Sequence, residues 1–85
     1  DDMLIIRGVN VFPSQVESVI LELPEFEPHY LIVVDRVNNT DTFQIQVEVR
    51  QEFYSDEMNK MIALKKKIAN RMHSVIGLQP DIKIV

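Results

Sequence analysis

The sequence predicts an α+β fold in which an N-terminal β-hairpin is followed by an α-β-β-α-β order of elements. We expect a two-layer sandwich with a mainly antiparallel sheet. Three observations support this: two segments carry apolar residues at helical spacing, one segment alternates apolar and polar residues, and short apolar runs are bounded by turn residues. With 85 residues, 46% of them hydrophobic, the chain can form a single domain with one modest core.

Residues 3–12 predict a short hairpin with an unusual interruption. The apolar run at residues 3–6 is followed by Arg7 and Gly8, and residues 9–12 (VNVF) read as a second strand. Glycine adopts positive φ angles without steric cost, so the chain is expected to turn at Gly8.

A first helix is predicted to begin at Pro13, because proline suits the first helical turn. Val16, Val19, Ile20 and Leu23 recur at intervals of three or four residues and form its apolar stripe. Pro24 is expected to end the helix, and residues 25–28 to form a connection.

Two strands are predicted next. Residues 30–34 (YLIVV) form a run rich in β-branched residues, as in a buried strand, and residues 38–41 (NNTD) form a turn cluster. Residues 43–49 then alternate strictly between apolar and polar, which predicts a strand with one buried face. The two strands should pair in an antiparallel hairpin. If both helices lie on one side of the sheet, the face carrying Gln44, Gln46 and Glu48 is left open.

A second, longer helix is predicted from Ser55, its proposed N-cap, with Asp56 and Glu57 in the first turn. Gly77 stands where a helix C-terminal glycine is expected, and residues 81–85 should return as a strand. The expected core-facing residues of this helix are Met58, Met61, Ile62, Ala63, Leu64, Ile68, Met72, Val75 and Ile76.

Composition excludes several classes of protein. The net charge of −4 argues against a nucleic-acid partner, and no apolar run approaches the ~20 residues that a membrane span needs. The chain contains no cysteine, which rules out disulfides and thiolate chemistry and fits a cytoplasmic location. The chain begins with Asp1 rather than Met, and its last residues stop within a predicted strand, so we expect a domain excised from a longer protein.

The opening stretch DDMLIIRGVNVFPSQVE (residues 1–17) resembles the hinge and first hairpin of the C-terminal domain of adenylate-forming acyl-CoA ligases. The segment IRGVNVFPS (residues 6–14) is similar to the corresponding segment in the phenylacetate–coenzyme A ligase branch of that superfamily. The resemblance extends over essentially all 85 residues, and the opening is its specific part.

The resemblance implies a role for this chain as the mobile C-terminal lid of an ATP-dependent arylacetate–CoA ligase. Such an enzyme uses ATP, accompanied by Mg²⁺, and coenzyme A, and its large N-terminal domain is the partner of the lid. It implies a hinge at Asp1 and Asp2, and a loop lining the CoA channel at Arg7, Gly8, Val9 and Asn10. The arginine that precedes the hinge in the family and the catalytic lysine lie outside this sequence. We therefore expect no catalytic residue here, no metal site, and no activity from the isolated domain.

Two alternatives remain open from the residues alone. The order of elements after residue 12 also suits an ACT-like βαββαβ module that binds amino acids, although such a site needs a glycine where Phe12, Pro13 and Ser14 stand. The second alternative is a dimerisation module that pairs through the polar face of the sheet. His29 and His73 share no metal-ligand spacing, so we expect structural or surface roles for both. Residues 65–67 (KKK) fan around a helix, so we expect them to form a solvated face.

Overall fold

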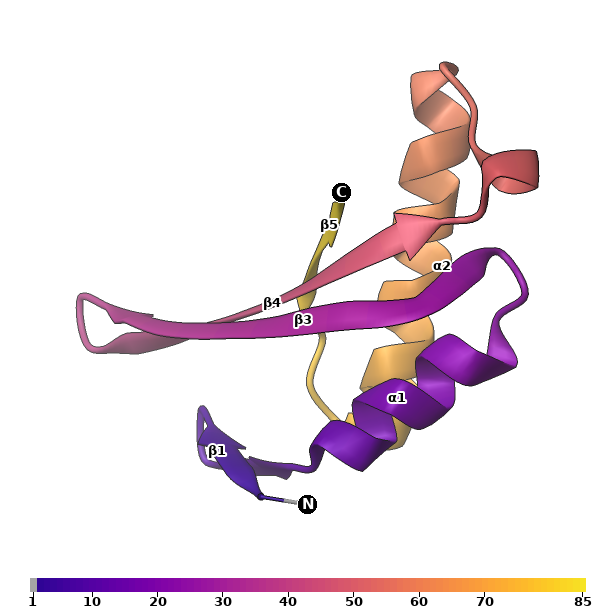
Figure 1. Cartoon of the computed structure of the whole chain (residues 1–85). Coiled ribbons are helices and arrows are strands. Elements are labelled where there is room, and N and C mark those ends of the chain that lie inside the picture. Colours follow the sequence, from indigo (N-terminus) through magenta and orange to yellow (C-terminus); the bar gives the residue numbers. More distant parts are fainter. Residues whose placement is uncertain (1) are drawn as a thin grey trace.

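The computed structural model describes residues 2–85, which form two sheets and two α-helices (Figure 1). A small hairpin of β1 (Leu4–Ile6) and β2 (Val9–Val11) comes first, followed by helix α1 (Pro13–Glu22). Strands β3 (Phe26–Val37) and β4 (Thr40–Val49) follow, then a short 3-10 turn η1 (Gln51–Phe53). Helix α2 (Met58–Ile76) and strand β5 (Asp81–Ile84) complete the chain.

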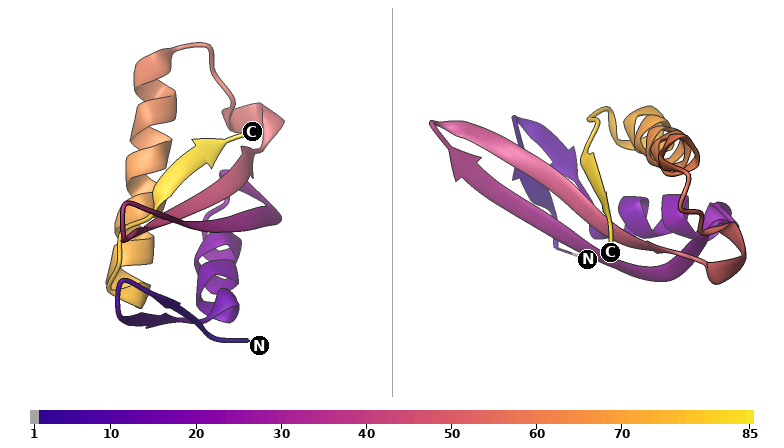
Figure 2. Two further views of the ribbon diagram at one scale, coloured as in Figure 1. Left: turned by 90° about the vertical axis from the view of Figure 1, so that its left-hand side faces the viewer. Right: turned by 90° about the horizontal axis from the view of Figure 1, so that it is seen from above.

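The main sheet has the order β3-β4-β5, with β3 and β4 antiparallel and β4 and β5 parallel. The N-terminal hairpin is a separate antiparallel two-stranded sheet. Both helices pack behind the same face of the main sheet, and its opposite face is open (Figure 2). The predicted α+β fold and element order are thus confirmed. Within residues 2–85, the main sheet contains no strand from before the first helix, which an ACT-like βαββαβ domain would require.

The core lies between the main sheet and the two helices, and the N-terminal hairpin contributes to it. The alternation in β4 has the predicted effect, because Phe43, Ile45 and Val47 are buried while Glu48 is exposed. The apolar stripe of α1 is buried as predicted. The full set of buried core residues is Ile6, Val11, Val16, Val19, Ile20, Leu23, Phe26, Phe43, Ile45, Val47, Ile68, Met72 and Ile76.

The start of α1 follows from its local sequence. Pro13 occupies the first helical position, where its missing N–H would have no intrahelical partner. The N–H of Phe12 donates to Oε1 of Gln15 at 3.0 Å, and the N–H of Gln15 donates to the carbonyl of Phe12 at 2.9 Å. These bonds fix the direction in which the chain enters α1 from the N-terminal hairpin.

Strand β3 differs from its prediction in length and in burial. It begins at Phe26, so most of the expected connection at residues 25–28 is strand, and Pro28 falls where the register shifts between Phe26 and Tyr30. Proline is tolerated there because it occupies an edge strand at a ladder irregularity. The segment at residues 30–34 is not a fully buried strand. It forms the sheet edge, and Leu31, which pairs with Gln46 on the open face, is 56% exposed.

Helix α2 begins later than predicted, at Met58 with Glu57 as its N-cap. Ser55 does not cap it; its hydroxyl accepts the N–H of Glu57 at 3.0 Å, and Asp56 and Glu57 precede the helix. The C-terminus agrees with the prediction, since Gly77 adopts a left-handed φ of 86° and its N–H donates to the carbonyl of His73.

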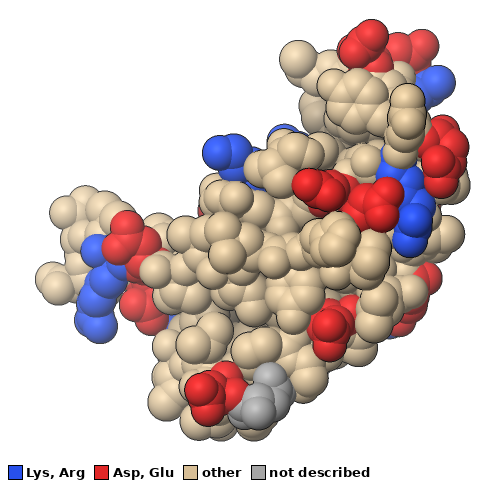
Figure 3. Space-filling view, in the orientation of Figure 1, with Lys and Arg blue, Asp and Glu red and all other residues tan. Residues whose placement is uncertain are grey.

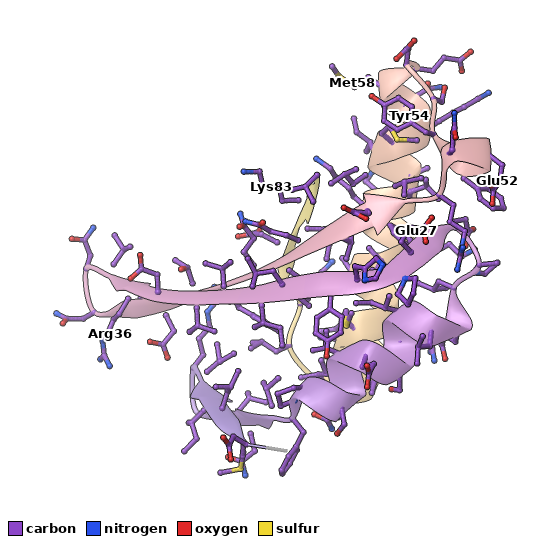
Figure 4. All side chains as sticks on the ribbon, viewed as in Figure 1. Glu27, Arg36, Glu52, Tyr54, Met58 and Lys83 are labelled. Atoms are coloured by element: carbon purple, nitrogen blue, oxygen red, sulfur yellow. The ribbon has the colours of Figure 1, made fainter. Side chains whose placement is uncertain are left out.

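The predicted core face of α2 is buried only in part, at Ile68, Met72 and Ile76. The assignment of four other residues to the core is wrong, because all four are exposed: Met58 (76%), Ile62 (42%), Val75 (38%) and Ala63. For Met58 the reason is that the first turns of α2 extend beyond the end of the sheet, and Met58 lies at that end of the helix (Figure 4). No helix within residues 2–85 combines the length and hydropathy needed to cross a membrane.

Candidate functional site: the β1–β2 hairpin

The candidate site is the turn between β1 and β2, which the family resemblance implies is a loop lining the CoA channel. Ile6 pairs with Val9, so Arg7 and Gly8 are the two turn residues. Both have positive φ angles, 50° for Arg7 and 75° for Gly8, which is the geometry of the tight turns that match the twist of a hairpin. Ile6, which directly precedes the turn, and Val11, which belongs to the pair farthest from the turn, are both fully buried. The strands of the hairpin are therefore anchored at both ends, and both turn residues are exposed.

Gly8 meets the requirement for backbone at a ligand surface. A Cβ built on Gly8 has no heavy atom within 4 Å, so the space outside the turn is open. Any side chain at this position would project outward rather than into the domain, at the cost of a strained positive φ. Within this chain, glycine is favoured at position 8 because of its positive φ angle and not because a side chain would clash. A side chain would clash only with another molecule that approached the turn.

The other expected site residues lie around the turn. Val9 is half-buried, whereas Arg7 and Asn10 are exposed, so the tip presents a guanidinium and an amide. Asp2 is exposed ahead of β1, and the expected hinge residue Asp1 lies outside the described residues.

Two hydrogen bonds attach the turn to the main sheet through Asp41, the second residue of β4. The N–H of Arg7 donates to Oδ2 of Asp41 at 2.9 Å, and Nε of Arg7 donates to the carbonyl of Asp41 at 2.8 Å. Asp41 is 34 positions away from Arg7 in the sequence. The only feature of the sequence that singles out Asp41 is its place in the turn cluster at residues 38–41, which indicates a turn and not a contact with Arg7. Sequence reasoning missed this contact because nothing local links the two segments.

The remaining candidates are not gathered at the turn. His29 lies on β3 and His73 in the last turn of α2, both exposed. Across residues 2–85, no group of three or more His, Cys, Asp or Glu side chains is placed to hold a metal ion.

Lys67 pairs with Glu25 instead of standing free for a phosphate. The lysine Nζ donates to Oε2 of Glu25, and the glutamate side chain is only 13% exposed. This hydrogen bond holds the pKa of the Glu25 carboxyl below its usual value. Arg71 does the same for Glu22, so two ion pairs join α2 to the segment around the end of α1. Lys65 and Lys66 are exposed.

The open face of the sheet carries a second, shallow feature. A depression of about 550 Å³ lies at the end of β5. One of the residues that border it is Glu27, which forms an ion pair with Arg50. Figure 3 shows that the face of the domain seen in Figure 1 is largely uncharged, with acidic and basic side chains in small groups. Its lining residues are Glu27, His29, Glu48, Val49, Gln51, Tyr54 and Val85.

Comparison with known proteins gives a consistent result. Residues 8–85 match the family described as the AMP-binding enzyme C-terminal domain. The chain is 43% identical over 90 aligned positions to a phenylacetate-coenzyme A ligase of Thermus thermophilus, covering 92% of this chain and 20% of that protein. It is 36% identical to the Escherichia coli phenylacetate-coenzyme A ligase, covering all of this chain and 20% of that protein. The chain thus spans about a fifth of the length of these curated relatives.

Solved structures share the fold. A domain of phenylacetate-coenzyme A ligase from Bacteroides vulgatus superposes with a TM-score of 0.91 and 33% identity, covering all of this chain and 79% of that one. A 2-hydroxyisobutyryl-CoA ligase, bound to its acyl adenylate and CoA in the thioesterification state, superposes with a TM-score of 0.92. Its identity is 22%, with all of this chain and 18% of that chain covered, so it supports the fold alone.

Proposed function

We propose, because this chain belongs to the AMP-binding enzyme C-terminal domain family, that it is the mobile C-terminal domain of an ATP-dependent arylacetate–CoA ligase. Phenylacetate is the acid we expect. The observation that carries this proposal is the similarity of nearly the whole chain to two phenylacetate-coenzyme A ligases, at 43% and 36% identity.

The proposed reaction has two steps. The acid carboxylate attacks the α-phosphorus of ATP, and pyrophosphate leaves as the acyl adenylate forms. The CoA thiolate then attacks the acyl carbonyl, and AMP leaves as the thioester forms. ATP, CoA and the aryl acid are substrates of the full-length ligase, and Mg²⁺ enters with ATP as its counter-ion. Since ATP and CoA are intracellular metabolites, we place the ligase in the cytoplasm.

The domain's proposed contribution is to change position between the two steps. Its partner is the large N-terminal domain of the same ligase, and Asp1 and Asp2 form the hinge, where a few backbone torsions can absorb a domain rotation. In the thioester step the exposed turn is turned toward the CoA channel. Arg7, Gly8, Val9 and Asn10 then form one wall, with Gly8 allowing the backbone to approach the pantetheine arm. None of these residues is proposed as an acid, base or nucleophile.

The test is a separation of the two half-reactions in the full-length ligase carrying Gly8→Leu. Adenylation, followed as acid-dependent exchange of pyrophosphate into ATP with phenylacetate and a panel of other acids, should be unchanged. CoA-dependent AMP release should fall about 100-fold, the scale expected when reacting groups are displaced by about 1 Å. The added side chain projects from the tip, so it obstructs only the conformation in which the tip meets CoA.

A matched control separates bulk from backbone strain. Gly77 also has a positive φ, 86°, and open space around its Cβ position, but it ends α2. Gly77→Leu therefore imposes a similar backbone strain at a different place and should leave both half-reactions intact. Equal loss of both steps in Gly8→Leu would refute the division of labour, and absence of pyrophosphate exchange with every acid would refute the ligase.

A further inference from the structure

Arg7 occupies a backbone conformation that its residue type does not favour. At a φ of 50° it lies in the left-handed region, which non-glycine residues other than Asn and Asp visit rarely. As the first of two turn residues, it also sits between the paired residues Ile6 and Val9, outside the strand ladder. Its N–H therefore needs a partner from elsewhere, or water.

Asp41 supplies that partner from the main sheet. Its carboxylate accepts the Arg7 N–H at 2.9 Å, and its backbone carbonyl accepts Arg7 Nε at 2.8 Å. The carboxylate bond is charge-assisted, and such bonds are among the stronger hydrogen bonds in proteins. Asp41 is half-buried and lies in the β3–β4 ladder, where it pairs with Arg36, two residues before the buried Phe43. Two bonds to one residue of the sheet fix both the backbone and the side chain of Arg7.

We propose that Asp41 is a positioning residue for the thioester-forming step. It acts through Arg7 by holding the Arg7–Gly8 turn at one height and orientation above the main sheet, and does not itself touch CoA. This inference rests on the proposed function of the turn. It assigns a role to a residue outside the 17-residue opening stretch that carries the family resemblance.

The physical consequence of losing the carboxylate is a turn with several orientations. The N–H of Arg7 would then bond to water, and the left-handed conformation of Arg7 would lose its support. Ile6 and Val11 would remain buried, so the two strands would stay attached and the loss of order would be confined to the Arg7–Gly8 turn. Only the fraction of molecules with the tip correctly oriented could complete the thioester step.

The experiment compares Asp41→Ala with Asp41→Asn in the full-length ligase. Asparagine keeps a side-chain oxygen that can accept the Arg7 N–H, and either variant keeps the backbone carbonyl. We expect Asp41→Ala to lower the rate of CoA-dependent AMP release about tenfold, the effect of losing about 1.4 kcal/mol of positioning energy, with pyrophosphate exchange unchanged. Asp41→Asn should recover most of that rate. A direct role of the negative charge toward CoA would leave Asp41→Asn as slow as Asp41→Ala, which would overturn the proposal.

Asp35→Ala is the matched control. Asp35 lies on the neighbouring strand β3, is exposed, and its carboxylate accepts the N–H of the adjacent Arg36. This variant removes the same charge from the same hairpin without touching Arg7, and should leave both half-reactions unchanged. If Asp35→Ala slows AMP release as much as Asp41→Ala, the effect is one of overall charge and the proposal fails.

A second readout does not depend on ligase activity. Amide hydrogen exchange of Arg7, measured by NMR on this 85-residue chain, should accelerate in Asp41→Ala and stay close to the parent rate in Asp41→Asn. Accelerated exchange in an active ligase with normal AMP release would mean that the tether exists but does not serve the reaction, which overturns the inference. Absence of any adenylation would refute the proposed function instead, and unchanged exchange would refute the tether.

Discussion

The two hairpins of this domain turn with the same backbone geometry but are stabilised differently. The β3–β4 hairpin turns at Asn38 and Asn39, with φ angles of 52° and 62°, and the β1–β2 hairpin turns at Arg7 and Gly8. Asparagine tolerates left-handed conformations, so the β3–β4 turn is favoured by its own residues. Arginine adopts such conformations rarely, and the conformation of Arg7 is supported by Asp41, 34 residues away.

The difference shows how a small domain can present a turn with a fixed orientation. A turn formed by its own residues does not depend on its surroundings for its conformation, and the tip of the β3–β4 hairpin lies at one extremity of the domain in Figure 1. A turn that depends on a distant carboxylate is held in register with the sheet that provides it. The second arrangement suits a surface that must meet a ligand in one orientation.

The largest expected effect concerns how the long hairpin is anchored. Phe43 is 1% exposed in the core under β4, so Phe43→Ala should reduce the free energy of unfolding by about 3–5 kcal/mol, measured by urea denaturation. A loss of this size approaches the whole stability of a small domain. Leu31→Ala, on the open face of the same hairpin, should change it by less than about 0.5 kcal/mol. A small effect of Phe43→Ala would mean that the hairpin does not depend on its core face.

An exchange of turn residues tests the comparison directly. Asn38→Arg places arginine in a left-handed turn without an equivalent of the Asp41 tether, and should reduce the free energy of unfolding by about 1 kcal/mol. Arg7→Asn keeps the N–H bond to Asp41 and gains a residue suited to positive φ, and should stay within about 0.5 kcal/mol of the parent. Urea denaturation of both variants measures the contrast. Equal effects would show that arginine needs no tether to occupy such a turn.

The smallest expected effect is pH-dependent and concerns the base of the long hairpin. Glu25, which immediately precedes β3, has its pKa lowered by the hydrogen bond from Lys67. The stability that this pair contributes is therefore fully present above the ordinary glutamate pKa of 4.5, and is lost as the pH falls through the lower folded-state pKa.

Lys67→Met provides the measurement for this pair. The difference in urea midpoint between the parent and the variant should be constant near pH 6 and shrink as the pH falls below about 4.5. The effect should be small because Lys67 is exposed to solvent, which screens the pair. A difference that grows on acidification would contradict the assigned direction.

Several features of the fold were predictable because they follow from local rules. Side-chain periodicity predicts strand β4 from its alternation. Backbone sterics predict the start of α1 from its proline and the end of α2 from the glycine that follows it. The errors occurred where packing overrides a local pattern. Met58 belongs to an apolar stripe but extends past the sheet, and the β-branched run around Leu31 forms an edge rather than a buried strand.

The candidate site divides in the same way. By itself, the sequence determined the α+β order, the turn at Gly8, the resemblance of residues 1–17 and the absence of cysteine chemistry, because these depend on residues close together in the chain. Only the tertiary structure decided that β4 and β5 run parallel, that one sheet face is open, that Lys67 is paired, and that Asp41 holds Arg7. These contacts join segments far apart in sequence, and their partners are chosen by how the sheet and helices pack, which no local pattern records.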